Sequence, residues 1–200
     1  MEIRIFGCKI YISLLFLTML TLILLIDKTG LMLVGILAVA VHESGHLIMM
    51  LILKNPPKEI IFQPCGIIIK KSDMIISSNR ELLTALGGCL NNLIFAAVFA
   101  LIYYIYQSDI AVSFFAANIG LILFNIACIK GLDGYDIVLN ILSRKTDADR
   151  ATKICKTISI STVIILTVGT LFMTVFANSS IMLLLCSLYL IILTLINLRS

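Results

Sequence analysis

The two histidines of the chain stand four residues apart, at His42 and His46, with Glu43 between them. At this chain's own residue frequencies, an HExxH pattern arises by accident in about four of 10,000 such chains. Residues four apart share one face of a helix, so both imidazoles can reach one metal ion while Glu43 lies near its open coordination position. Zinc is the expected ion, one per chain, and Glu43 is the expected general base for a water molecule.

A third metal ligand is expected from elsewhere in the chain, because catalytic zinc takes three protein ligands and keeps one position for water. No further histidine is present, so this ligand should be a carboxylate. The other acids lie in expected loops or near the N-terminus, except Asp133 and Asp136. These two occur in an apolar segment that Lys130 and two glycines interrupt, where irregular backbone can line a polar cavity. From the residues alone, both aspartates stay open as the third ligand.

Long apolar runs surround these residues and are expected to be membrane-spanning helices. Sixty per cent of 200 residues are hydrophobic, which at about 20 residues per span allows six spans at most. The expected spans are approximately 10–26, 30–53, 82–106, 110–142 with a break near 130, 158–177 and 181–198. The HExxH pattern lies inside the second, where His and Glu are costly to bury without a functional reason. The sequence predicts an all-α polytopic membrane protein with one membrane-embedded domain over 1–200 and no appended soluble domain.

The charged residues indicate orientation in the membrane. Only 13% of the chain is charged, about half the share of a typical soluble domain. With six spans, 13 of the 15 basic residues fall on the side of both termini, which the positive-inside rule assigns to the cytoplasm. We therefore expect a multi-pass cell-membrane protein with cytoplasmic termini and a metal site toward the cytoplasm. The net charge of +4 is then a topology signal, and a nucleic-acid partner is not expected because no basic stripe with aromatic residues is present.

The connection between the second and third expected spans contains two β-rich pieces. Residues 59–62 and 67–71 flank the turn-forming sequence Gln-Pro-Cys-Gly at 63–66. This pattern predicts a small membrane-associated β-hairpin, although an interfacial loop that dips into the headgroups would also fit. The six cysteines form no CxxC pair and are expected to be reduced.

Three blocks in the chain resemble the site-2 protease family of intramembrane zinc metalloproteases. The first is the HESGH sequence at 42–46, and the second is Gly-Cys-Leu-Asn-Asn at 88–92, which resembles the family's Gly-Pro-x-x-Asn. The third is Asn125 followed by Leu-Asp-Gly at 132–134, which resembles Asn-x-x-Pro-x-x-Pro-Leu-Asp-Gly. The six-span plan is similar to the branch that contains the bacterial sporulation protease, which processes an inactive sigma-factor precursor.

The resemblance implies roles for individual residues. It makes Asp133 the third metal ligand, with Asp136 as the fallback. It also implies that Asn125 and Asn92 hold the substrate backbone or stabilise the oxyanion, although hydrogen bonding between helices explains Asn92 equally well. The chain departs from the family pattern where Cys89, Cys128 and Gly131 replace prolines, which puts the local backbone path in question.

The expected function is hydrolysis of a peptide bond in or next to the membrane segment of a protein substrate. A sigma-factor precursor, an anti-sigma factor and a signal-peptide remnant are candidate substrates, and regulatory membrane proteins are candidate partners beside the lipid bilayer. An exposed strand in the 55–80 region could hold an unwound substrate segment by strand addition. The alternatives are a membrane protein that binds or transports a metal without proteolysis, and an inactive family member. Transport is disfavoured because the first, fifth and sixth expected spans carry few polar residues.

Overall fold

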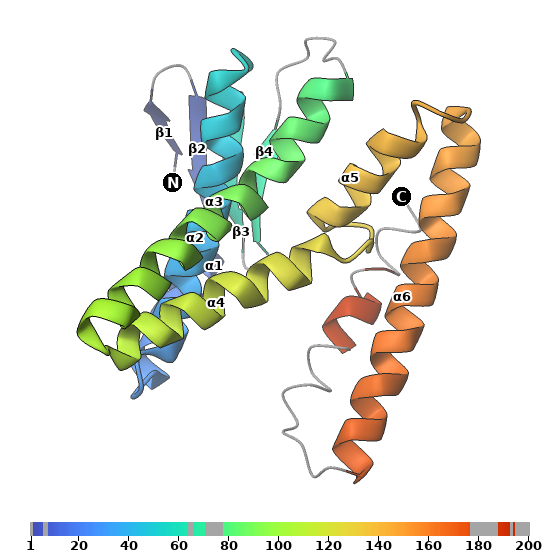
Figure 1. The fold of residues 1–200 in the computed structure, drawn as a ribbon. Coiled ribbons are helices and arrows are strands. Elements are labelled where there is room, and N and C mark those ends of the chain that lie inside the picture. The colour runs from blue at the N-terminus through green and yellow to red at the C-terminus, as the bar shows by residue number, and fades with distance from the viewer. Residues whose placement is uncertain are drawn as a thin grey trace. The chain divides into compact units, whose positions relative to one another are not determined.

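The computed structural model describes residues 2–5, 8–63, 66–70, 78–176, 188–192 and 194. The chain divides into two compact units, Met1–Ile122 and Leu123–Ser200. The first contains the sheet and the HExxH helix, and the second contains the segment that carries Asp133. Helix α4, Asp109–Ile126, is labelled in Figure 1 and contains the boundary between the two units.

Three further helices belong to the first unit: α1 is Leu14–Ile26, α2 is Leu31–Ile52 and α3 is Ser78–Tyr106. Helices α2 and α3 pack against each other along a line of mostly small and polar buried residues. A tight turn joins α1 to α2, where the Asp27 carboxylate accepts hydrogen bonds from the N–H groups of Leu33 and Gly30. These bonds, that of Leu33 above all, lower the pKa of the Asp27 carboxyl below its usual value. The turn therefore supplies partners for N–H groups at the start of α2.

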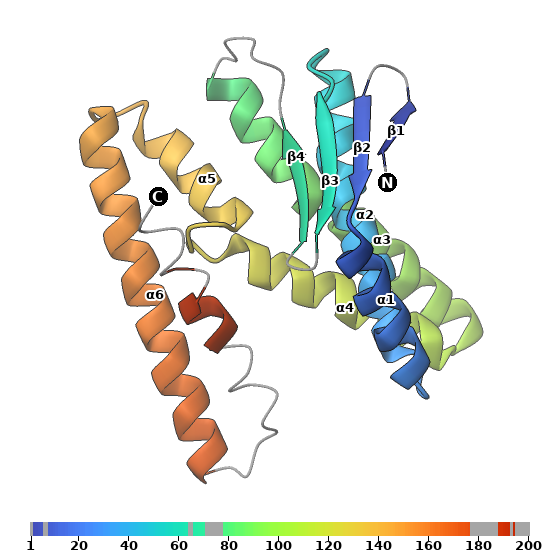
Figure 2. The ribbon, with the colours of Figure 1, turned by 180° about the vertical axis from the view of Figure 1, so that it is seen from behind.

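A four-stranded sheet with the order β1-β2-β3-β4 also belongs to this unit, as Figure 2 shows. Its strands are β1, Glu2–Ile5; β2, Cys8–Ile12; β3, Glu59–Gln63; and β4, Gly66–Lys70. The hairpin predicted between the second and third spans is the antiparallel β3–β4 pair. Strand β2 pairs with β3 in parallel and with β1 antiparallel. The N-terminal residues thus add two strands to the predicted hairpin.

The prediction that the first membrane-spanning helix begins at Ile10 is wrong. Residues 8–12 form β2, and Ser13 caps a helix of only 13 residues, its hydroxyl accepting from the Phe16 N–H at 3.1 Å. Such a helix is about 20 Å long, which is less than the hydrocarbon thickness of about 30 Å. The apolar count missed the alternation of Lys9, Ile10, Tyr11 and Ile12, which is the period of a strand. The summed hydrophobicity of such a strand does not distinguish it from the start of an apolar helix.

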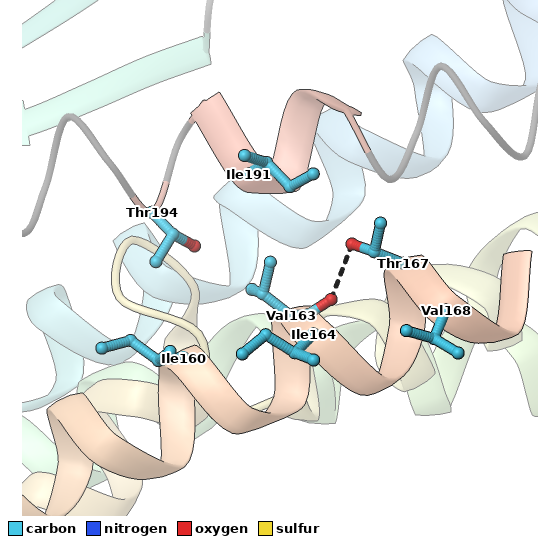
Figure 3. Close-up of a pocket in the computed structure, with 7 residues that line it drawn as sticks. All are labelled: Ile160, Val163, Ile164, Thr167, Val168, Ile191 and Thr194. Atoms are coloured by element: carbon cyan, nitrogen blue, oxygen red, sulfur yellow. Dashed lines mark hydrogen bonds between the residues drawn. The ribbon is translucent and has the colours of Figure 1, made fainter. Parts of the chain in front are cut away.

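The second unit contains α5, Asp133–Leu142, and α6, Ala148–Phe176. Its described apolar core is formed by Ile129, Val163 and Leu190. Residues of α6 together with Ile191 and Thr194 line an apolar pocket of about 430 Å³, in which Thr167 donates to the Val163 carbonyl of its own helix (Figure 3). The expected span 158–177 thus belongs to a longer helix that starts at Ala148. Most of the expected span 181–198 lies outside the described residues.

Four of the described helices, α2, α3, α4 and α6, are long and apolar enough to cross a membrane. The expected fourth span, 110–142, corresponds to α4 and α5 separated by a non-helical segment at 127–132. The total of six spans stays a prediction. The described part of the chain is thus mainly helical with one small sheet, and its helices have the length and apolar character of a membrane protein.

Candidate metal centre

His42 and His46 lie together on the buried face of α2. Their side chains are 4% and 8% exposed, and their Nε2 atoms are 3.2 Å apart. Two nitrogen ligands at 2.0–2.1 Å from a tetrahedral zinc ion would be about 3.3 to 3.4 Å apart. The spacing of the two Nε2 atoms therefore fits a shared zinc ion, as the four-residue interval predicts.

The backbone of α3 orients the second imidazole. The Nδ1 atom of His46 lies 2.8 Å from the carbonyl oxygen of Thr84. A carbonyl can only accept, so Nδ1 carries the proton and the lone pair of a neutral ring is on Nε2. This is the arrangement in which histidine usually binds metals, because the second hydrogen bond fixes both the tautomer and the ring orientation. Thr84 orients the His46 ring through its backbone carbonyl, so no side-chain motif in the sequence identifies this residue.

Gly88 of α3 makes room for the imidazole pair. A Cβ atom at this position would lie 2.6 Å from Cε1 of His42 and 2.6 Å from Nε2 of His46. Real Cβ atoms essentially never approach other heavy atoms this closely. The glycine of the second sequence block is therefore explained by the space that the two rings occupy.

The two middle residues of the HExxH pattern, Ser44 and Gly45, both contact α3. Gly45 and Gly87 face each other so closely that a Cβ atom at either would clash with the carbonyl group of the other. Next to this crossing, the Asn91 amide donates to the Val41 carbonyl at 2.6 Å and to the Ser44 hydroxyl at 3.0 Å. Asn91, unlike its neighbour Asn92, stands at a position that the second sequence block leaves unspecified.

Glu43 is half-buried on α2, directly beside His42. Asn92 on α3 is completely buried, and neither polar atom of its amide has a hydrogen-bond partner among the described residues. An unpaired buried amide costs about 1–3 kcal/mol, so such groups are rare without a function or a bound water. The explanation of Asn92 as a helix-to-helix hydrogen-bonding residue finds no support in these contacts.

In the second unit, Asp133 and Asp136 both lie in the first turn of α5. Asp133 is half-buried, whereas Asp136 is exposed. Asn125 is half-buried in the last turn of α4. Gly134, which follows Asp133, lies so close to the end of α4 that a Cβ atom there would clash with the carbonyl groups of Ile126, the last residue of α4, and of Ala127. The Asp-Gly pair therefore allows α5 to begin against the end of α4.

The backbone at Gly131 differs from the path that a proline would take. Its φ is +105°, which glycine adopts readily, while proline is fixed near −65°. Gly131 stands where the resembling pattern has a proline, and its conformation is one that proline cannot adopt. Between the two helices, Leu132 has an extended backbone and forms no side-chain cap for α5.

The fold is similar to that of a solved structure, the site-2 protease from Methanocaldococcus jannaschii. The superposition has a TM-score of 0.69 and covers 100% of this chain and 95% of the archaeal chain, with 20% sequence identity. No protein-family model matches the sequence. The search of curated proteins also found no match. The chain therefore has a site-2 protease fold at a sequence distance where the fold alone is shared.

Proposed function

We propose that this chain is an intramembrane zinc metalloprotease of the site-2 protease family. The observation that carries the proposal is the buried imidazole pair of α2, whose Nε2 atoms lie at a spacing suited to one tetrahedral ion. The similarity in fold over the whole chain supports it. A metal-binding pair inside an apolar helix of membrane-crossing length favours chemistry within the bilayer.

The proposed metal-binding set is His42, His46 and Asp133. Two neutral imidazoles and one carboxylate form a donor set typical of catalytic zinc. We favour Asp133 over Asp136 because Asp133 matches the family pattern and is the less exposed of the two in the second unit. Zinc bound here would supply Lewis acidity, which polarises a peptide carbonyl and makes a water molecule more acidic.

Glu43 is the proposed general base. It takes the proton of the attacking water and later delivers a proton to the leaving amine. Asn92 and Asn125 are proposed to bind the substrate backbone or the developing oxyanion. The Asn92 amide suits this role because both of its buried polar atoms lack partners among the described residues, so they remain available to a substrate.

The proposed substrate is the membrane segment of another protein, a part of which must be extended at cleavage. Strand β4 lies at the edge of the sheet and offers a place for strand addition. Candidate substrates are a sigma-factor precursor, as in the sporulation branch, an anti-sigma factor or a signal-peptide remnant. We place both termini and the catalytic site on the cytoplasmic side, on the basis of the loop charges.

The test is to purify the Glu43→Gln variant with the wild type and to measure zinc content and peptide-bond cleavage. Equal zinc content with loss of cleavage is the expected result, because the amide cannot take a proton. Comparison of membrane-peptide fragments from cells that carry either form would identify the substrate as a fragment that stays intact only in the variant. Cleavage at the wild-type rate by Glu43→Gln would refute the proposed mechanism.

The third ligand is tested by two matched substitutions in one helical turn. Asp133→Asn should lower zinc affinity by at least about tenfold, since a neutral amide is a weaker ligand, whereas Asp136→Asn should keep it. The reverse result would transfer the role to Asp136. Unchanged zinc affinity in both variants would show that the third ligand is another group.

A further inference from the structure

The irregular segment between α4 and α5 is held by a side chain of α6. The backbone N–H of Lys130 donates to the hydroxyl oxygen of Ser159 at 3.0 Å, and Ser159 is 0% exposed. A buried N–H group outside regular structure needs a partner, because an unpaired one costs free energy. In this protein the partner is a residue of α6 that lies 29 positions further along the chain.

Ser159 belongs to a buried stripe along α6. Residues 151, 155, 159 and 163 recur at intervals of four, which places Ala151, Cys155, Ser159 and Val163 on one face of the helix. The first three are small and 0% exposed. Small residues let another backbone approach a helix closely. The stripe is therefore suited to receive a piece of backbone.

Three consecutive residues of the segment meet this stripe. The thiol groups of Cys128 and Cys155 lie near each other. Ile129 is 0% exposed and lies in the same apolar cluster as Val163. Lys130 is bound through its N–H to Ser159. These contacts fix residues 128–130 one after another on α6.

The residues that follow connect this piece to α5, and the Leu132 N–H donates to the Ile129 carbonyl at 2.9 Å. Gly131 has a positive φ, and a glycine can leave such a conformation more easily than other residues. Leu132 forms no side-chain cap, and Asp133 comes directly after it. The position of the Asp133 backbone therefore depends on where α6 holds residues 128–130.

We propose that Ser159 is a positioning residue for Asp133, acting through its hydrogen bond to the Lys130 N–H. The inference rests on the proposed function, in which Asp133 is a metal ligand. The contact with α6 thus holds a segment in which the resembling sequence pattern has prolines at the positions of Cys128 and Gly131. Ser159 itself touches neither substrate nor metal in this scheme.

The first test is a Co²⁺ titration of the detergent-solubilised protein, followed by the absorption bands of the ion. Ser159→Ala should weaken Co²⁺ binding about tenfold, the lower end of what loss of a supporting partner costs a metal site. Ser161→Ala, an exposed serine of the same helix, is the matched control and should bind like the wild type. Far-UV circular dichroism should show equal helix content in all three proteins. Unchanged affinity in a folded Ser159→Ala protein would overturn the proposal.

A second variant covers the case in which Ser159→Ala does not fold. Ser159→Cys keeps the size of the side chain and replaces the oxygen by a weaker acceptor. The Co²⁺ affinity of Ser159→Cys should lie between that of the wild type and that expected for Ser159→Ala, which has no hydrogen-bond acceptor. Wild-type affinity in Ser159→Cys would then overturn the proposal.

The native thiol pair provides a readout that needs no metal. Diamide accepts two electrons and two protons as the Cys128 and Cys155 thiols form one disulfide, which peptide mass spectrometry detects. Ser159→Ala should slow this reaction severalfold, because the segment no longer stays on α6; an equal rate would count against the proposal. If the wild type bound no metal, the proposed function would fail, while a slower reaction in Ser159→Ala would still show that Ser159 holds the segment.

Discussion

The imidazole pair of α2 and the aspartate at the start of α5 are positioned in different ways. His42 and His46 belong to one regular helix, whose repeat alone brings their side chains to one face. Asp133 follows six residues that belong to no helix, and its place depends on contacts with α6. One half of the proposed metal centre is thus fixed by backbone geometry and the other by tertiary contacts.

This difference determines where each half is vulnerable. The imidazole pair is most sensitive to what fills the space beside it, because its own helix keeps the spacing of the two rings. The aspartate is most sensitive to the conformation of the chain that leads to it. Substitutions in the two regions should therefore fail for different reasons, and the following experiments separate these reasons.

The largest effect is expected for Gly88→Ala. The new methyl group would lie 2.6 Å from atoms of both imidazoles, so the rings must move apart and zinc binding should fall by at least about a hundredfold. Zinc content and Co²⁺ titration measure the effect. Gly35→Ala in α2 is the control, because a Cβ atom there meets nothing within 4 Å. Metal binding by Gly88→Ala that equals the control would contradict the close approach of α3 to the rings.

A smaller effect is expected for Gly131→Pro, which tests the other half. Proline cannot adopt the φ of +105°, so residues around 131 must take another path and zinc affinity should fall about tenfold. The zinc affinity of Gly131→Ala should lie between those of Gly131→Pro and the wild type, since an alanine at positive φ is strained by about 1–3 kcal/mol. If the proline variant bound zinc as well as the wild type, the segment could follow the path of the family pattern.

The same contrast explains how much the sequence could predict. The HExxH spacing identifies the histidine pair because a helix converts sequence interval directly into geometry. The interruption near Lys130 was visible because glycines and a charge stand in an apolar run. The contact with Ser159 was not visible, because no local rule connects residues 130 and 159.

The fold was predictable to a similar extent. Apolar length gave helices α2, α3 and α4 within a few residues, and turn residues gave the β3–β4 hairpin. The pairing of β2 with β3 joins the N-terminal residues to a segment about 50 residues away, which no local pattern encodes. The close crossing at Gly45 and Gly87 was missed for the same reason, since it depends on which helix faces which.

A modest effect is expected for Asn91→Ala, which removes two hydrogen bonds between α2 and α3. The loss should lower the free energy of unfolding by about 0.6–2 kcal/mol, the range for hydrogen bonds between helices in membranes. Thermal unfolding in detergent measures it, and zinc affinity should change less than threefold. Asn140→Ala is the matched control, because the Asn140 side-chain amide donates to the backbone carbonyl of Asp136 within the same helix. An equal loss of unfolding free energy in both variants would show that the hydrogen bonds between α2 and α3 stabilise the fold no more than a bond within one helix.

The smallest effect is expected in the sheet, where the backbone already fixes the geometry. The carboxylate of Glu59 in β3 accepts from the Lys70 ammonium of β4 at 2.9 Å, and this bond lowers the pKa of Glu59 below its usual 4.5. A carboxyl with a lowered pKa stabilises the fold above its unfolded-state pKa and loses that contribution as pH falls through the folded-state value. The stability difference between the wild type and Glu59→Gln should therefore be present at pH 6 and vanish toward pH 3. Unfolding in detergent at a series of pH values tests this, with Lys70→Gln and the double variant completing the cycle. A difference that persists at pH 3 would mean that Glu59 acts by packing rather than by charge. The sheet would then depend on side-chain contacts, as the segment before Asp133 does.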